Sequence, residues 1–181
     1  EIFKVMGPGV AWVDMHTLAY KTILSHLVAG GLLTGDVDEM MEANLGATFM
    51  PHGLGHLIGL DAHDVGGYEP GTARDTRSGY KSLRLQRVLQ TGMVMTVEPG
   101  CYFIDWLLDA AISDPKLSPF LVLDRLEQFR GTGGVRLEDS LLITDSGIRN
   151  LTTCPRTVAD VEAVMAGTIT HRSQLTRKGG P

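Results

Sequence analysis

The sequence predicts one globular domain of mixed α+β structure, from its length, its composition and the order of its hydrophobic patterns. At 181 residues, with 43% hydrophobic and 20% charged residues, the chain has the size and composition of a single folded domain. Helical periodicity dominates the first part, whereas later parts contain short apolar runs bounded by glycine and proline. Helices followed by strands are typical of an α+β domain.

Helices are expected near both ends of the chain. Asp14 is a suitable N-cap for a helix whose apolar residues recur at helical spacing as far as Gly30. A second, shorter helix is expected from about residue 37 to 44. A last amphipathic helix is expected over about 158–165, and the polar residues 168–181 are expected to form a flexible tail.

Strands are expected in the middle of the chain and again after a helical stretch. Residues 93–98 (MVMTVE) and 101–104 (CYFI) flank a Pro-Gly pair and predict a β-hairpin, and 134–144 (GVRLEDSLLIT) predicts a further strand. The intervening segment 105–130 is expected to be helical. Residues 50–67 (MPHGLGHLIGLDAHDVGG) are too rich in glycine for a long helix and predict strand and loop.

Charge, cysteine content and hydropathy narrow the class of partner. The formal net charge is −5 and no Lys/Arg-rich run precedes the final residues, so the sequence does not indicate nucleic-acid binding. The two cysteines, Cys101 and Cys154, show no C-x-x-C spacing, which favours a reducing compartment and a cytoplasmic location. No apolar run approaches the roughly 20 residues of a membrane span, so a membrane is not expected as a partner.

Three of the six histidines lie together on the glycine-rich segment 50–67. These are His52, His56 and His63, on a backbone that is able to approach a ligand closely. A loop whose histidines only hydrogen-bond locally is the alternative, and this segment alone leaves it open. An H-E-x-x-H zinc helix is excluded, because glycines disfavour a helix here and no glutamate follows the first histidine. The isolated histidines are assigned no functional role: His16, His26 and His171.

Acidic residues at strand positions suggest what the histidines bind. Glu98 ends an otherwise apolar strand, and a carboxylate buried there requires a cation or strong hydrogen bonds. Arg136 and Glu138 alternate along the later strand and therefore share one face, although a plain Arg–Glu pair on a solvated strand remains the alternative. One imidazole with two carboxylates suits manganese, cobalt or zinc. Two such ions about 3.5–4 Å apart are able to share a hydroxide that attacks a carbonyl.

Three long motifs, in one order, carry a family resemblance. FMPHGLGHLIGLDAHDVGG, GMVMTVEPGCYF and GTGGVRLEDSLLITDSG resemble the creatinase/methionine aminopeptidase superfamily, peptidase family M24, and within it the prolidase family. The resemblance extends from VMGPGVAWVDMH to CPRTVADVEAVMAG. It implies the pita-bread fold, a curved antiparallel sheet flanked by helices. It also implies hydrolysis of Xaa-Pro dipeptides by a hydroxide that bridges two divalent metal ions, most often Mn²⁺, with Co²⁺ or Zn²⁺ possible, in an enzyme that forms homodimers.

The resemblance also assigns roles to individual metal-site residues. His56 and Glu98 are expected to bind one metal ion, and Glu138 is expected to bridge both ions. Glu98 is in addition the expected general base. The family uses two aspartates as well, from strands that precede the first helix of this chain, and Asp14 at a predicted helix start is not expected to replace them.

Four further residues are expected to serve the substrate. His63 is expected to stabilise the tetrahedral intermediate and the leaving proline nitrogen, and His52 is expected to line the substrate pocket. Arg136 is expected to support the catalytic site and the substrate. Arg84, in YKSLRLQR, is expected to bind the C-terminal carboxylate of the dipeptide.

The resemblance predicts that residues 1–181 form the C-terminal part of the catalytic domain, without the N-terminal domain and the first metal-ligand strands. With three of the five ligands, this chain is expected to bind one metal ion weakly or none and to be inactive alone. Two alternatives remain. Aminopeptidase P shares the metal ligands but accepts longer peptides, and Arg84 favours the dipeptidase. A non-catalytic binding module would normally have lost ligands, whereas three are retained here.

Overall fold

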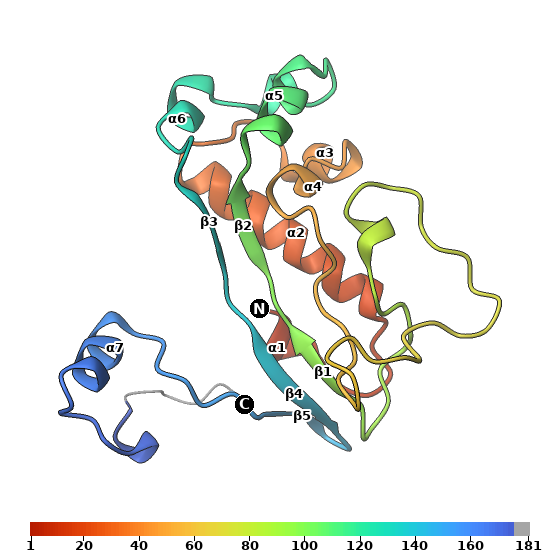
Figure 1. Cartoon of the computed structure of the whole chain (residues 1–181). Coiled ribbons are helices and arrows are strands. Elements are labelled where there is room, and N and C mark those ends of the chain that lie inside the picture. The colour runs from red at the N-terminus through yellow and green to blue at the C-terminus, as the bar shows by residue number, and fades with distance from the viewer. Residues whose placement is uncertain (176–181) are drawn as a thin grey trace.

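The computed structural model describes residues 1–175 and contains helices and antiparallel strands, which confirms the predicted α+β class. A long ribbon of paired strands runs through the molecule, and the longest helix packs against it (Figure 1). The α-helices are α1 (Ile2–Val5), α2 (Trp12–Ala29), α3 (Val37–Glu42), α4 (Gly46–Phe49), α5 (Asp105–Ser113), α6 (Leu123–Glu127) and α7 (Val158–Met165). The strands are β1 (Val94–Val97), β2 (Gly100–Phe103), β3 (Gly133–Arg136), β4 (Asp139–Thr144) and β5 (Gly147–Asn150). Short 3-10 helices are η1 (Tyr80–Ser82), η2 (Ser118–Phe120) and η3 (Arg172–Gln174).

Helix α2 begins earlier than the sequence predicts. Its first residue is Trp12 and its N-cap is Ala11, whereas the expected cap, Asp14, lies exposed in the first turn. The N–H of Trp12 donates to the carbonyl of Arg87 over 3.0 Å, so a bond to a distant segment fixes where the helix starts. In the first turn, the charge of Asp14 still stabilises the positive end of the helix dipole.

The other predicted helices are present. Helix α3 follows Asp36, whose side chain accepts the backbone N–H groups of Asp38 and Glu39 over 2.8 and 3.1 Å, as a helix N-cap does. The region 105–130 contains α5, η2 and α6, in agreement with the expected helical stretch. These elements cover one end of the ribbon (Figure 1).

The C-terminal helix also lies where the sequence predicts it. Helix α7 is capped by Thr157, whose hydroxyl accepts the N–H of Asp160 over 3.0 Å. The expected flexible tail, 168–181, is described as far as residue 175 and includes η3. Residues 176–181 lie outside the described residues.

The predicted hairpin between β1 and β2 is wrong. Strand β1 pairs antiparallel with β4, and β2 pairs antiparallel with β3, so the two strands continue in one direction (Figure 1). A two-residue hairpin needs a central residue with positive φ, and Gly100 does not have one. The pair Pro99-Gly100 therefore extends the strand instead of turning it.

The ribbon keeps one register across a break. Val97 lies opposite Asp139 and Gly100 lies opposite Arg136, so the register places Glu98 opposite Glu138. Between this pair and the Gly100–Arg136 pair, the N–H of Leu137 donates to the carbonyl of Pro99 over 3.1 Å. The reciprocal hydrogen bond, from residue 99 to the carbonyl of Leu137, cannot form because proline has no N–H. The single strand predicted over 134–144 is consequently two strands, β3 and β4, separated at residues 137–138.

The glycine-rich histidine segment lies along the free edge of β1 as a loop, with one isolated bridge between Leu57 and Met95 in place of the predicted strand. The N–H of Thr96 donates to the carbonyl of His56 over 2.9 Å, and the N–H of Glu98 donates to the carbonyl of Leu54 over 2.8 Å. The backbones approach so closely that a Cβ on Gly55 would lie 2.1 Å from the carbonyl oxygen of Thr96. Glycine is therefore required at position 55 for His56 to lie beside β1.

Two apolar clusters hold α2 in place. One joins α2 to the ribbon and includes Trp12, Met95 and Leu141, each with no exposed surface. The other joins α2 to the helices at the end of the ribbon and includes Leu24 and Phe49. Among residues 1–175, none of the helices combines the length and apolar character that a membrane crossing requires.

His16 on α2 is buried among aromatic rings. It has no exposed surface, and its ring centroid lies 4.4 Å from that of Tyr20 and 4.7 Å from that of Tyr80. Neither ring nitrogen has a hydrogen-bond partner. Burial, together with smaller effects of the nearby His52 and Arg77, lowers the pKa of His16 to about 4. His16 is therefore a neutral core residue at ordinary pH.

The free energy of unfolding is expected to fall between pH 6.5 and pH 4. In this window the unfolded chain binds a proton at His16 and the folded chain does not, so the stability present above pH 6.5 is lost on acidification. The loss from this one group is about 3 kcal/mol, for a pKa lowered from 6.5 to about 4. His16→Phe should reduce the pH dependence by that amount in urea unfolding at pH 7, 5 and 4. His26→Phe, at an exposed histidine of the same helix, is the control and should leave the pH dependence unchanged. An unchanged pH dependence in His16→Phe would contradict this account.

Candidate metal centre

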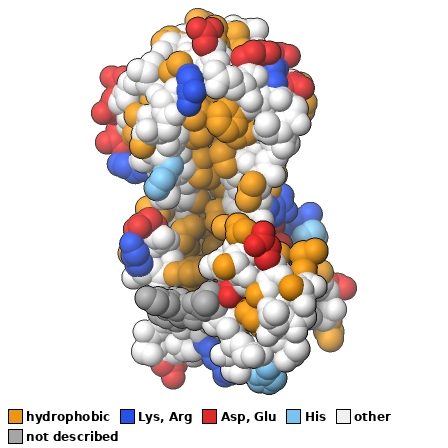
Figure 2. Space-filling model, turned by 90° about the vertical axis from the view of Figure 1, so that its left-hand side faces the viewer, with side chains coloured by type: hydrophobic (Ala, Val, Ile, Leu, Met, Phe, Trp, Pro, Cys, Tyr) orange, Lys and Arg blue, Asp and Glu red, His pale blue; other side chains and the backbone are white. Residues whose placement is uncertain are grey.

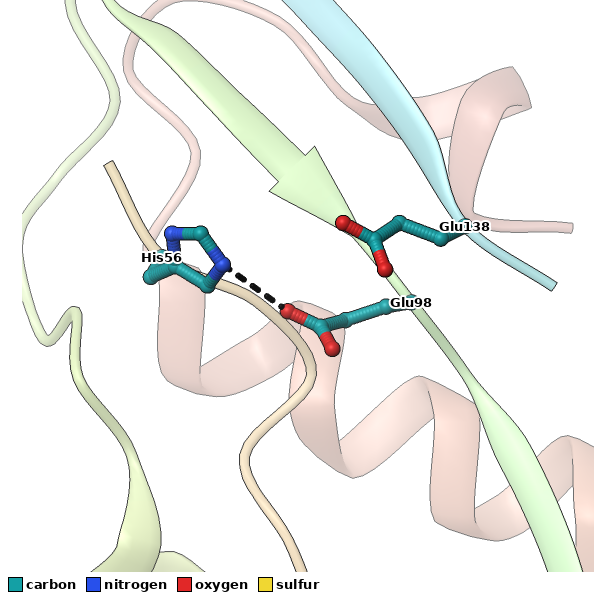
Figure 3. A group of neighbouring side chains, drawn as sticks. All are labelled: His56, Glu98 and Glu138. Carbon is teal, nitrogen blue, oxygen red and sulfur yellow. Dashed lines mark ion pairs between the residues drawn. The ribbon is translucent and has the colours of Figure 1, made fainter. Parts of the chain in front are cut away.

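Three side chains from separate segments converge at the break in the ribbon. His56 comes from the segment beside β1, Glu98 follows β1, and Glu138 precedes β4 (Figure 3). One potential ligand atom from each lies within 4.8 Å of the other two. The structure therefore brings together the three residues that the sequence predicts as metal ligands, and their ligation of a metal remains a prediction.

The ribbon register explains why the two glutamates meet. Opposite residues of an antiparallel pair share one face, so the side chains of Glu98 and Glu138 project to the same side. The hydrogen bond between Leu137 and Pro99 makes the adjacent Glu98–Glu138 pair a non-hydrogen-bonded one. The Cα atoms of such a pair approach to about 4.5 Å. Two carboxylates are thus held close together, an arrangement that a cation stabilises.

Glu98 is buried and strongly bonded, as its sequence position predicts. Only 7% of the residue is exposed. The hydroxyl of Thr96 donates to its Oε1 over 2.9 Å, and Nη1 of Arg136 donates to its Oε2 over 3.0 Å. Nε2 of His56 lies 3.3 Å from Oε1. Thr96 was not predicted as a site residue, although its position two residues before Glu98 places it on the same strand face.

His56 has the tautomer that metal binding requires. Its Nδ1 lies 2.9 Å from the carbonyl of Leu57, and a carbonyl only accepts, so Nδ1 carries the proton. Nε2 is then the ring nitrogen that faces the glutamates and is able to offer a lone pair to a metal. A second hydrogen bond, from the backbone N–H of His56 to the hydroxyl of Thr96 over 3.0 Å, fixes the residue beside β1. Such outer hydrogen bonds orient metal-binding histidines.

Tyr102 supports Arg136 and was also missed from the sequence. Nε of Arg136 donates to the Tyr102 hydroxyl over 2.6 Å, and this bond raises the pKa of Arg136. The tyrosine ring lies across two glycines of the ribbon. A Cβ on Gly100 or Gly134 would lie 2.5 or 2.4 Å from the ring. These glycines allow the ring to lie flat along the ribbon, so that its hydroxyl reaches Arg136.

The predicted substrate residues line a cavity beside the three ligands. Its volume is about 270 Å³, and His52, His63, Arg84 and Arg136 contribute to its wall together with Ser82, which was not predicted. An adjoining cavity of about 280 Å³ contains Glu138 and shares four residues with the first: His56, His63, Glu98 and Arg136. His56 and Glu98 therefore line both cavities, and Glu138 lines the second.

The cavity histidines differ in environment. Burial lowers the pKa of His52, and its Nδ1 donates to the carbonyl of Gly53 over 2.8 Å. His63 is exposed, and its ring packs edge-on against that of His56 at a centroid distance of 4.4 Å. His52 is thus held as part of the wall, whereas His63 has a solvent-facing ring next to the candidate ligands.

The donor set fits a divalent transition metal. One imidazole nitrogen and two carboxylates are ligands that manganese, cobalt and zinc accept. Ligand bonds of about 2.1 Å place opposite ligands about 4.2 Å apart. The separations of up to 4.8 Å between the three ligand atoms therefore need only small side-chain movements to close around one ion.

Comparison with known proteins identifies the family. The model of metallopeptidase family M24 matches residues 1–145. The chain belongs to metallopeptidase family M24. Among M24 relatives, Xaa-Pro dipeptidase of Homo sapiens is 55% identical over 166 residues, which cover 92% of this chain and 34% of that protein. A probable Xaa-Pro aminopeptidase of Sordaria macrospora is 43% identical over 165 residues, 91% of this chain and 35% of that protein.

A solved aminopeptidase structure is similar to this chain over most of its length. Aminopeptidase PepP of Pseudomonas aeruginosa matches with a TM-score of 0.65 and 35% sequence identity, over 92% of this chain and 31% of that one. The chain thus spans about a third of the length of these relatives. Membership of a metallopeptidase family implies a divalent metal ion, and the cluster of His56, Glu98 and Glu138 is the candidate site for it.

Mn²⁺ binding is expected to depend on Glu138. Glu138→Gln removes one anionic ligand and should weaken Mn²⁺ binding more than about tenfold. The reason is that loss of a residue that only hydrogen-bonds to a metal ligand already weakens binding by about that factor. Isothermal titration calorimetry measures the Mn²⁺ affinity of the longest natural form of the protein that contains this chain, and circular dichroism checks the fold. Asp145→Asn, at an exposed carboxylate in the turn after β4, is the matched control. Equal affinities in both variants would exclude Glu138 as a ligand.

Proposed function

We propose that this chain is the metal-binding catalytic part of an Xaa-Pro dipeptidase, with Mn²⁺ as the metal it most readily uses and Co²⁺ or Zn²⁺ as alternatives. The observation that carries the proposal is the position of Arg84 in the same cavity as the candidate metal ligands. A cavity lined by candidate metal ligands and by an arginine suits a short peptide with a free C-terminal carboxylate. The 55% identity to human Xaa-Pro dipeptidase supports the same substrate class.

The proposed chemistry divides between the metal and the side chains. His56, Glu98 and Glu138 would hold the metal, which would supply Lewis-acid chemistry: a lowered pKa for water and polarisation of the scissile carbonyl. Glu98, buried beside Thr96 and Arg136, serves as ligand and as the base that accepts a proton. His63 donates a hydrogen bond to the charge that develops on the carbonyl oxygen, a contribution of about 3 kcal/mol for one well-placed donor.

The remaining residues position the substrate in this proposal. Arg84 binds the carboxylate of the terminal proline, and His52 forms the wall against which the substrate lies. Arg136 balances the negative charge of Glu98 and is itself held by Tyr102. Proline nitrogen has no N–H to donate, so a cavity that selects by shape and by the terminal carboxylate accepts proline without needing that donor.

The same matches support two structural proposals. The TM-score of 0.65 to an aminopeptidase supports the pita-bread fold as the architecture to which the ribbon and α2 belong. The resemblance to prolidases supports a homodimer as the assembled form.

Aminopeptidase P is the second candidate activity, favoured by the structural match and by the 43% identity to a probable Xaa-Pro aminopeptidase.

Hydrolysis of Gly-Pro in the presence of Mn²⁺ tests the proposed reaction. The assay measures release of the N-terminal glycine by the longest natural form of the protein that contains this chain, with Gly-Pro, Gly-Pro-Ala and Gly-Ala as substrates. Only Gly-Pro should be hydrolysed rapidly, and EDTA or Glu98→Gln should abolish turnover. Faster hydrolysis of Gly-Pro-Ala would assign the chain to aminopeptidase P instead. No turnover on any Xaa-Pro peptide would refute the peptidase function.

Arg84 is expected to set the preference for dipeptides. Arg84→Ala removes a charged hydrogen bond worth about 1.5–3 kcal/mol, so KM for Gly-Pro should rise about 10- to 100-fold. KM for Gly-Pro amide, which lacks the carboxylate, should change little. Lys81→Ala, at an exposed neighbouring cation, is the control. Equal losses on Gly-Pro and its amide would remove Arg84 from the carboxylate site.

A further inference from the structure

Arg156 connects the C-terminal segment to the break in the ribbon. It lies two residues before α7, yet its Nη2 donates to the backbone carbonyl of Glu138 over 2.6 Å. The same nitrogen lies 2.8 Å from Oδ1 of Asp139, a residue that is only 8% exposed. Nδ2 of Asn150, at the end of β5, donates to the same oxygen over 3.1 Å. One guanidinium nitrogen thus holds two consecutive residues, of which the first is a candidate metal ligand.

The break leaves the backbone of Glu138 dependent on such a contact. In the non-hydrogen-bonded Glu98–Glu138 pair, the backbone groups of both residues point away from the partner strand. On one side, the N–H of Glu98 is held by the carbonyl of Leu54 over 2.8 Å. On the other side, β5 ends at Asn150, which pairs with Leu141, before the ladder reaches Glu138. Arg156 provides the donor at this position.

The Arg156–Asp139 pair lies on the reverse face of the ribbon from the metal ligands. Side chains alternate along a strand, so Leu137 and Asp139 face away from the side of Glu138. On that reverse side, Arg156 and Asp139 line a cavity of about 240 Å³ with the apolar residues Pro99 and Leu137. The left-hand face of the molecule, turned to the viewer in Figure 2, shows a hollow with apolar side chains. Only 23% of the Arg156 side chain and 11% of the Asp139 side chain are exposed, so solvent screens this pair less than a surface pair.

We propose that Arg156 is a positioning residue for the metal centre. By holding the Glu138 carbonyl and the Asp139 carboxylate, it fixes the backbone at the break and with it the direction in which the Glu138 side chain projects. It also ties residues 151–165, including α7, to the geometry of the ligands. The inference rests on the proposed metal site but not on the proposed peptidase reaction.

Metal binding distinguishes positioning from a purely structural contribution. Arg156→Ala should weaken Mn²⁺ binding about 10- to 100-fold, the range found for residues that orient metal ligands. It should also change the visible absorption spectrum of bound Co²⁺, because that spectrum reports ligand geometry. Arg156→Lys should recover most of the affinity, since a single nitrogen makes both contacts. Arg149→Ala, which removes an exposed arginine from neighbouring β5, should bind both metals like the unchanged chain.

Circular dichroism first verifies that each variant is folded at the temperature of the titration. Arg156→Gln, which keeps an amide donor but loses the charge and the length, is measured in parallel in case Arg156→Ala does not fold, and it should show the same weakening. At least one of the two variants, Arg156→Ala or Arg156→Gln, is expected to fold. If a folded variant binds Mn²⁺ and Co²⁺ as tightly as the unchanged protein, the inference is overturned. All variants are made in the longest natural form of the protein that contains this chain, because the chain alone has only three of the five expected ligands. Failure of that unchanged form to bind either metal would instead refute the metal site itself, so the two outcomes are separate.

Discussion

The placement of two carboxylates opposite each other on one antiparallel ribbon is the constraint around which this structure is arranged. Glu98 and Glu138 face the same side in a shared register, at a point where Pro99 cannot complete the ladder. Like charges at this distance repel unless a cation lies between them. In the described residues, Nη1 of Arg136 donates to Glu98 and so compensates part of its negative charge.

The surrounding residues restrict the orientations of the side chains around the two glutamates. Gly55 allows the histidine segment to lie against β1, and Gly100 and Gly134 make room for the ring of Tyr102. Thr96 bonds to both the backbone of His56 and the carboxylate of Glu98. Each of these features fixes the orientation of a side chain at the site and adds little buried apolar surface. A metal site requires such fixed side chains, because the ligands must already be oriented when the ion binds.

Stability and site geometry are provided by different parts of the molecule. Helix α2 packs its apolar face, with Trp12 and Met15, against the ribbon, and this burial holds the strands that carry the glutamates. The cavity side of the ribbon is polar, with charged residues from three segments around one space. A buried histidine such as His16 belongs to the first part and His56 to the second. Only their surroundings separate them, because both are histidines with almost no exposed surface.

The sequence by itself determined which side chains could take part. Spacing along the strand placed Arg136 and Glu138 on one face, the apolar run before Glu98 predicted its burial, and the motifs identified the family. The tertiary structure decided how these pieces meet. A Pro-Gly pair is compatible with a turn or an extended strand, and only pairing with β3 and β4 makes β1 and β2 continue in one direction. The contacts of Thr96, Tyr102 and Arg156 likewise depend on register and on segments distant in sequence, which local patterns do not encode.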